Sequence, residues 1–130
     1  MKYLFDSSSI YTALKPETIR KLIGNYTLEL ARFEIGNIIW KERALHKRIT
    51  EDEQETLMDL ATSALKNMSI LKIDGHENGI LKLTSKINDS YYDSSYVYFA
   101  NVMDVPLVTA DNKLSKKIKG YVQVEIVENI

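Results

Sequence analysis

The alternation of apolar and polar positions predicts short strands separated by helices along the whole chain. Short apolar runs and stretches with a period of two indicate strands at residues 2–5, 69–74, 106–110 and 122–127. Apolar residues that recur every three or four positions indicate helices at residues 7–14, 28–47, 51–67, 76–88 and 92–103, with a short basic helix after residue 111. Strands alternating with helices favour a mainly parallel sheet covered on both faces. We therefore expect an α/β fold with three layers, α/β/α.

Two of the predicted helices carry distinct sequence signals. The helix at 28–47 has an apolar stripe typical of a core-facing helix, formed by Leu30, Ala31, Ile35, Ile38, Ile39 and Leu45. The next helix begins with a capping box, in which Thr50 is followed three residues later by Glu53. That helix should therefore start directly after Thr50 and run to about Asn67.

Composition limits the class of protein. The chain has 130 residues, of which 45% are hydrophobic and 27% are charged, values that fit a single domain over residues 1–130. The absence of cysteine excludes disulfides and thiolate metal sites. The net charge is −1, so a contact with nucleic acid must use a local basic patch. The first residues do not form a signal peptide, and no apolar run reaches the roughly 20 residues of a spanning helix, so we expect a cytoplasmic protein.

Two acids directly follow predicted strands. Asp6 ends the first strand, and Asp111 ends the strand at 106–110. An Asp between a strand and a helix is most often an N-cap. However, ligands of parallel sheets bind at the carboxyl ends of the strands, where topology reverses. Together the two acids suggest a site at this edge of the sheet.

Two further acids stand out by the helix face that they occupy. Glu34 lies within the apolar stripe, between Leu30 and Ile38. Most helical glutamates face solvent, so a glutamate at this position is atypical. Asp93 heads the helix at 92–103 and shares a face with apolar residues one and two turns later. The simpler interpretation of Glu34 is a residue at the edge of the stripe that reaches water, and that of Asp93 is a helix cap. Nearby Asp89 competes with Asp93 for any role in a site. We prefer Asp93.

Several carboxylates at one point favour binding of a hard divalent cation. Mg²⁺ and Mn²⁺ prefer oxygen ligands, keep several waters and are held by few carboxylates. A carboxylate cluster without a counter-charge would be repulsive. In phosphodiester hydrolysis such ions activate water and stabilise the leaving oxygen. The sequence therefore predicts metal-dependent phosphodiester hydrolysis, with Asp6, Glu34, Asp93 and Asp111 as metal ligands and catalytic acids.

The ordered segments FDSSSI, LARFEIGNIIW, YYDSSYVYFA and VPLVTADNKL resemble the PIN domain, and most closely its VapC-type toxin branch. The resemblance covers nearly the whole chain and matches the four acids in order. It implies a PIN-like fold, and it implies hydrogen-bonding support from Ser8 and from Thr109 in the T-x-D motif. It also implies a Mg²⁺- or Mn²⁺-dependent endoribonuclease, commonly a homodimer neutralised by a cognate antitoxin. Asn112 departs from the pattern by offering no further acid after Asp111.

Other polar and aromatic residues have simpler interpretations. His46 and His76 lie in polar surroundings and are expected on the surface. The tyrosines at 91, 92, 96 and 98 are more often core or interface than base-stacking residues. The lysines after Asp111 most often form a solvated face, yet a nuclease needs cations for the flanking phosphates. Lys113 and Lys116 are our candidates for contact with RNA.

Apolar residues on more than one helix face predict a homodimer. Phe33, Ile39 and Trp40 lie outside the narrowest core stripe of their helix, and Tyr92, Tyr98, Phe99 and Met103 surround the helix at 92–103. We expect aromatic side chains to meet across a two-fold axis, unless one domain buries them internally.

Two other functional classes stay open from the sequence. A phosphoacceptor signalling domain has a similar length and acids at strand ends, but it requires an acidic pair after the first strand, where FDSSS has one acid. A catalytically silent module that binds RNA or a partner would keep the fold without the reaction. The RNA target, the number of metal ions and the antitoxin are not determined by the sequence.

Overall fold

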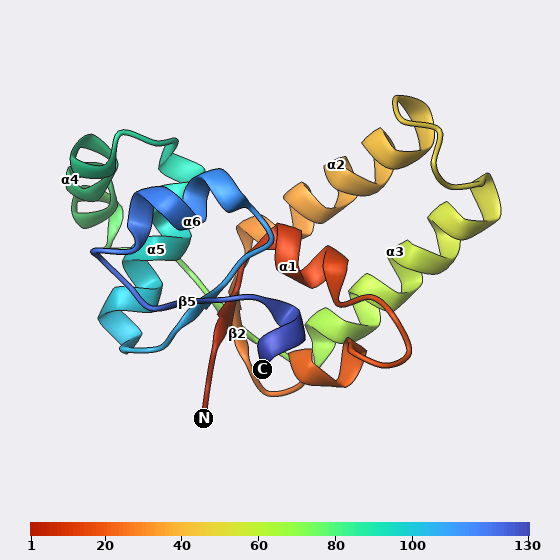
Figure 1. The fold of residues 1–130 in the computed structure, drawn as a ribbon, viewed down its shortest axis with the longest axis horizontal. Coiled ribbons are helices and arrows are strands. Elements are labelled where there is room, and N and C mark those ends of the chain that lie inside the picture. Colours follow the sequence, from red (N-terminus) through yellow and green to blue (C-terminus); the bar gives the residue numbers. More distant parts are fainter.

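The computed structural model describes residues 1–130 and places five short strands in one sheet (Figure 1). The strands are β1 (Leu4–Phe5), β2 (Tyr26–Leu28), β3 (Ser69–Leu71), β4 (Leu107–Val108) and β5 (Val124–Glu125). Their order across the sheet is β3-β2-β1-β4-β5, and every neighbouring pair is parallel. The predicted α/β class with a parallel sheet is therefore confirmed.

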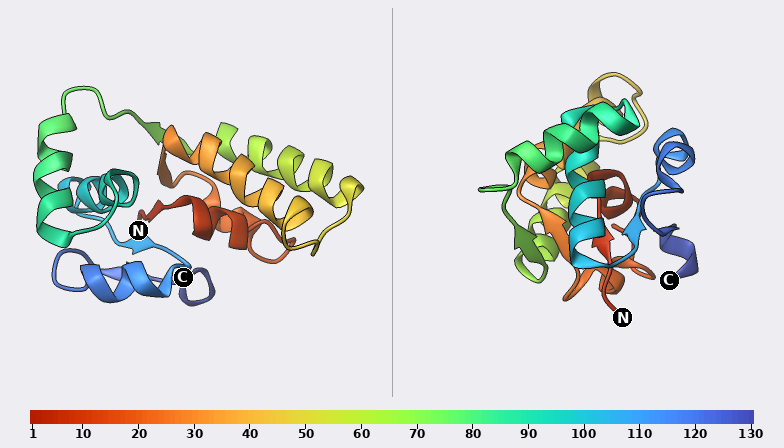
Figure 2. Two further views of the ribbon diagram at one scale, coloured as in Figure 1. Left: turned by 90° about the horizontal axis from the view of Figure 1, so that it is seen from above. Right: turned by 90° about the vertical axis from the view of Figure 1, so that its left-hand side faces the viewer.

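Helices cover both faces of this sheet. They are α1 (Ser7–Thr12), α2 (Leu30–Ala44), α3 (Glu51–Lys66), α4 (Glu77–Ile87), α5 (Tyr91–Met103) and α6 (Asn112–Ile118), with short 3₁₀ helices η1 (Ile19–Leu22) and η2 (Val127–Asn129). One hydrophobic core contains residues of α1, α2 and α3, and the other contains residues of α4, α5 and α6. Figure 2 shows these two groups of helices on opposite sides of the strands. None of the helices is both long and apolar enough to cross a membrane.

Alternation along the central strands explains the two cores. In β1, Leu4 packs with the α4–α6 layer and Phe5 with the α1–α3 layer, and in β4 Leu107 and Val108 divide in the same way. Successive side chains of a strand point to opposite faces of the sheet. All four side chains are fully buried. Strands this short can therefore serve both cores at once.

Strand β2 is the element that the sequence prediction missed. Leu28 was expected to begin a helix, but it ends β2, and α2 begins at Leu30. Only Glu29 separates the strand from the helix, so the apolar residues of the two elements form one continuous pattern that was interpreted as a helix. Leu45, expected in the core stripe, is exposed because α2 ends at Ala44.

The predicted capping box at the start of α3 is confirmed. The Oγ1 of Thr50 accepts a hydrogen bond from the backbone N–H of Glu53 at 3.1 Å, and Oε1 of Glu53 accepts one from the backbone N–H of Thr50 at 2.9 Å. These bonds satisfy two backbone donors that the helix leaves unpaired. The start of α3 is thus set by local chemistry.

The strand order determines where a site can form. From β1 the chain builds β2 and β3 on one side, and it then crosses to β4 and β5 on the other. The ends of β1 and β4 are therefore neighbours, with Phe5 paired to Val108 in the ladder. This reversal is the kind of switch point at which parallel sheets bind ligands. The residues that follow these two strands are Asp6 and Thr109.

Candidate active site

Asp6 lies in a hydrogen-bond network that joins the ends of β1 and β4. Its Oδ1 accepts from the backbone N–H of Ser9 at 2.9 Å and from the hydroxyl of Ser8 at 2.8 Å, and its Oδ2 accepts from the Thr109 hydroxyl. The residue is 5% exposed. Burial raises the pKa of its carboxyl, and the hydrogen bonds from Thr109, Ser9 and Ser8 oppose that shift. Asp6 is thus both the N-cap of α1 and a buried acid held in one orientation.

Ser8 and Thr109 also fix the chain that leads to Asp111. Their hydroxyl oxygens lie 3.3 Å apart. The backbone N–H of Ala110 donates to the Ser8 hydroxyl at 3.0 Å, and that of Asp111 donates to the Thr109 hydroxyl at 3.1 Å. The loop after β4 is therefore tied to the start of α1, and the two hydroxyls set the position of Asp6 relative to Asp111.

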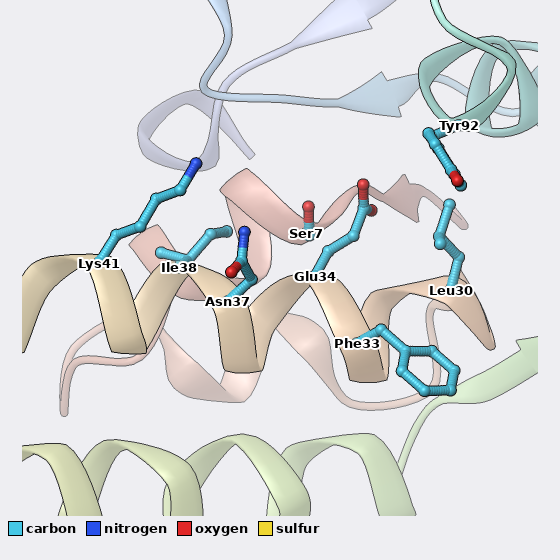
Figure 3. Close-up of a pocket in the computed structure, with 8 residues that line it drawn as sticks. All are labelled: Ser7, Leu30, Phe33, Glu34, Asn37, Ile38, Lys41 and Tyr92. Atoms are coloured by element: carbon cyan, nitrogen blue, oxygen red, sulfur yellow. The ribbon is translucent and has the colours of Figure 1, made fainter.

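Glu34 joins this region from α2 and is bonded to α5. Its Oε1 accepts a hydrogen bond from the hydroxyl of buried Tyr96 at 2.7 Å, and Figure 3 shows its carboxylate directed toward Ser7. Burial raises the pKa of Glu34, hydrogen bonds from Tyr96 and Ser7 lower it, and the negative charge of Asp6 raises it. The sequence indicated Tyr96 as core or interface, and the structure places it in the core. Its bond to Glu34 joins residues 62 positions apart and had no local signal.

Asp93 lies in the first turn of α5, but it is not the helix cap. Ser90 caps the helix, since its hydroxyl accepts from the backbone N–H of Asp93 at 3.0 Å. The pKa of Asp93 is raised to about 7, chiefly by burial, then by the hydrogen bond and charge of Asp89, and then by the charges of Asp111 and Asp6. Asp93 therefore lies within the electrostatic reach of two other predicted acids.

Asp89, the competing candidate, lies beside Asp93 and has its own partners. Its Oδ1 accepts from the backbone N–H of Ser90 at 2.6 Å, and its Oδ2 lies 3.7 Å from the ammonium of Lys117. Lys117 also donates to the carbonyl of Asn88 at 2.8 Å. Asp89 is thus partly neutralised, whereas Asp93 has no cationic partner.

Asp111 is the most exposed of the four predicted acids. It caps α6, with its Oδ1 accepting from the backbone N–H of Leu114 at 3.1 Å. One carboxylate oxygen is occupied by the cap, and the other is available to a ligand. Its charge raises the pKa of Asp93. The capping interpretation is therefore right for Asp6 and Asp111, and it coexists with their proximity to the other acids.

No cationic side chain of the protein pairs with any of the four acids. The ion pairs of the chain are Arg32–Glu29, Arg48–Glu42 and Lys117–Asp89. Partly buried negative charges that repel one another favour either protonation or a bound cation. The uncompensated charge is the main electrostatic feature of this edge of the sheet.

The donor set fits a hard divalent cation that keeps water ligands. No group of three or more His, Asp or Glu side chains lies close enough together to hold a metal ion by itself. Mg²⁺ is compatible with this arrangement because it commonly uses one or two carboxylates and retains several waters. An ion enclosed entirely by protein ligands would not fit. The assignment of Asp6, Glu34, Asp93 and Asp111 as ligands stays a prediction.

The candidate RNA-contacting lysines lie on α6, and His76 lies between α4 and α5. Lys113 and Lys116 are exposed on α6, the helix that Asp111 begins. His76 was expected on a polar surface, and this was wrong. Its Nδ1 lies 2.9 Å from the Tyr98 hydroxyl, and its ring packs edge-on against Tyr98 and Phe99. His76 therefore packs α4 against α5.

Two curated proteins from Pyrobaculum aerophilum resemble the chain over almost its full length. "Exonuclease VapC9" is 29% identical over 127 residues, which cover 96% of this chain and 92% of that protein. "Ribonuclease VapC3" is 25% identical over 130 residues, covering 94% of this chain and 98% of that protein. The resemblance to VapC-type proteins that the sequence predicted is therefore borne out over nearly the whole chain. No protein-family model matches it.

A solved structure shows the same fold. The crystal structure of PAE2754 from Pyrobaculum aerophilum superposes with a TM-score of 0.79 at 27% sequence identity, covering 99% of this chain and 92% of that one. The likeness includes the three-layer arrangement with its parallel sheet. The PIN-like fold expected from the sequence is therefore confirmed.

Proposed function

We propose that the protein is a Mg²⁺- or Mn²⁺-dependent endoribonuclease that hydrolyses RNA phosphodiester bonds. The observation that carries this proposal is the set of four acids at the switch point of the sheet, none of which has a cationic partner. The charge of Asp6 contributes to the raised pKa of Glu34, and the charges of Asp111 and Asp6 contribute to the raised pKa of Asp93. The names of the relatives, an exonuclease and a ribonuclease, support nuclease chemistry.

The mechanism assigns separate tasks to the residues of the chain. Asp6, Glu34, Asp93 and Asp111 would hold the cation, one or two of them directly and the others through its water ligands. The bound cation would supply charge neutralisation and lower the pKa of a coordinated water. Ser8 and Thr109 keep Asp6 in one orientation through their hydroxyl donors. Tyr96 does the same for Glu34. Lys113 and Lys116 are exposed on α6 and would attract the phosphates that flank the cleaved bond.

RNA cleavage by purified protein tests this assignment. Linear and circular RNA are incubated with the protein in Mg²⁺, in Mn²⁺ and in EDTA. Asp6→Asn and Asp93→Asn should each abolish cleavage, since each removes a charged oxygen donor while keeping the side-chain size. Asp59→Asn, on the exposed face of α3, is the matched control and should retain wild-type activity.

The circular substrate separates two modes of cutting. An endonuclease linearises circular RNA, whereas an exonuclease leaves it intact because it has no end. Cleavage by rigorously purified Asp6→Asn protein, or cleavage that persists in EDTA, would exclude the proposed mechanism. An intact RNA pool under all conditions would instead favour the catalytically silent binding module.

We further propose that the protein acts in the cytoplasm as the toxin of a toxin–antitoxin pair. The proposal rests on the similarity to two curated proteins whose names include VapC, together with the resemblance of the four acidic segments to the VapC-type toxin branch. The antitoxin would be a small protein encoded beside it. Co-expression with the product of the neighbouring reading frame should give a stable complex that no longer cleaves RNA. A neighbour that neither binds the protein nor inhibits it would contradict this role.

A further inference from the structure

A groove of about 460 Å³ adjoins the acidic region along α2. It is lined by Ser7, Leu30, Phe33, Glu34, Asn37, Ile38, Lys41 and Tyr92. Glu34 belongs to the predicted site, Ser7 directly follows Asp6, and Tyr92 directly precedes Asp93. The groove is therefore continuous with the place where a phosphodiester bond would be cut.

One face of α2 forms the floor of this groove. Leu30, Glu34 and Lys41 recur at spacings of one and two helical turns. Figure 3 shows the Tyr92 ring beyond the end of Leu30 and the Lys41 side chain extended at the opposite end, with Glu34 between them. Two turns of helix, about 10 Å, separate Glu34 from Lys41. The groove thus presents an aromatic ring on one side of the acid and a cation on the other.

Tyr92 and Lys41, at the two ends of the groove, are both accessible to a ligand. Tyr92 is 60% exposed although it is a large aromatic residue. Lys41 takes part in none of the ion pairs of the chain. Aromatic faces stack on unpaired bases, and ammonium groups pair with phosphates. An apolar peptide would match the apolar and aromatic half of the lining, but it would cover Glu34 and Lys41 without satisfying their charges. The lining therefore favours a nucleotide chain.

We propose that this groove binds the single-stranded RNA beside the cleaved bond, a proposal that rests on the ribonuclease function given above. Tyr92 stacks on an unpaired base, and Lys41 pairs with a backbone phosphate two helical turns beyond Glu34. Asn37, exposed on the floor of the groove, presents its amide to a base edge. A base must be unstacked to reach the ring, so the groove selects single strands over duplexes.

Binding is measured separately from cleavage, using Asp6→Asn protein and a fluorescently labelled single-stranded RNA of mixed sequence in Mg²⁺ buffer. Adding Tyr92→Ala should weaken the affinity roughly 5- to 150-fold, the loss typical of one stacked base. Tyr92→Phe keeps the ring and should restore the affinity. Lys41→Gln should reduce the slope of log affinity against log salt by about 0.7, the value for one phosphate contact on a single strand.

Two substitutions outside the groove serve as matched controls. Tyr121→Ala removes an exposed tyrosine that lines a different pocket, and Lys66→Gln removes an exposed lysine at the end of α3. Both should leave the affinity and the salt slope unchanged. Circular dichroism of each variant checks that the fold is retained, as expected for substitutions at exposed positions.

The outcomes of these experiments test the groove proposal separately from the ribonuclease proposal. Unchanged RNA affinity in the Tyr92→Ala protein would overturn the groove proposal, whether or not the wild-type protein cleaves RNA. Weakened affinity together with a wild-type protein that cleaves no RNA would support the groove and reject the ribonuclease. An unchanged salt slope in Lys41→Gln would overturn the phosphate contact. Equal affinity for duplex RNA would overturn the selection for single strands.

Discussion

At the scale of residues, burial and mutual repulsion govern the predicted acids. Burial is the largest cause of the raised pKa of Asp6, Glu34 and Asp93, and the charge of a neighbouring acid contributes at Glu34 and Asp93. A carboxyl with a raised pKa holds its proton in the folded protein at a pH where the unfolded chain has lost it. Folding is then linked to proton uptake.

The metal-free protein should therefore lose stability as pH rises. Between pH 4 and about 7, the folded-state pKa of Asp93, the folded protein binds more protons than the unfolded chain, so the free energy of unfolding falls with increasing pH. Urea denaturation in EDTA at pH 5 and pH 8 should show this decrease. Asp93→Asn should reduce it, Asp59→Asn should not, and Mg²⁺ should restore stability at pH 8. Equal stability of the wild-type protein at both values would contradict the prediction.

A second prediction at this scale concerns Ser94, whose hydroxyl is buried without a hydrogen-bond partner. An unsatisfied buried polar group costs about 1–3 kcal/mol. Ser94→Ala should therefore raise the free energy of unfolding by about 1 kcal/mol. Its neighbour Ser95 is the matched control, since its hydroxyl donates to the Tyr91 carbonyl at 2.7 Å. Chemical denaturation should show Ser94→Ala as the more stable variant, and the reverse order would refute the assignment.

At the scale of elements, two glycines show how helices meet their neighbours. Gly36 lies in α2, where an added Cβ would meet only the Met58 side chain, at an ordinary 3.6 Å. Gly79 lies in α4, where an added Cβ would come within 2.7 Å of the Tyr98 ring. Tyr98 is held in place by its contacts with His76. The two positions differ in packing and share a helical backbone.

Replacing each glycine by alanine should therefore have opposite effects. Gly36→Ala should stabilise the protein by about 0.5–1 kcal/mol, because alanine reduces the backbone entropy of the unfolded chain. Gly79→Ala reduces the backbone entropy of the unfolded chain in the same way, but the new methyl group must displace the Tyr98 ring. The substitution should therefore be destabilising overall. Thermal denaturation of the two variants checks this difference, and a stabilised Gly79→Ala protein would show that α4 and α5 separate at little cost.

At the scale of the whole molecule, the apolar surface bears on assembly. Ile39 and Phe99 were among the apolar residues offered for a second contact surface, but both are buried within the domain. Phe33 and Trp40 are 76% and 51% exposed and lie seven residues apart on α2, so they share a helix face. Exposed aromatic residues of this kind are typical of interfaces. The expected homodimer is therefore narrowed to a surface that includes Phe33 and Trp40.

Light scattering across a range of protein concentrations tests this assembly. We predict a dimer whose mass falls to that of a monomer in the Trp40→Glu protein, because a charge would be placed within an apolar contact. Tyr121→Glu changes an exposed aromatic residue elsewhere and should leave the dimer intact. A wild-type protein that stays monomeric at high concentration would refute the dimer.

The sequence by itself determined the features that depend on a few neighbouring residues. The capping box of Thr50 and Glu53, the helices and the longer strand signals follow from contacts within about four positions. The acids at strand ends could be selected because Asp6 directly follows β1 and Asp111 follows the predicted strand at 106–110, of which β4 forms the central part. The sequence did not separate β2 from α2, since three strand residues carry too short a pattern to stand apart from the helix.

The tertiary structure alone decided which of these residues meet. Thr109 bonds to Asp6 across 103 positions of sequence, and Tyr96 bonds to Glu34 across 62. Such contacts arise from the strand order and from the packing of helices on opposite faces, which no local pattern encodes. The same holds for the groove between Tyr92 and Lys41, since a cavity forms only where distant elements fail to fill the space between them.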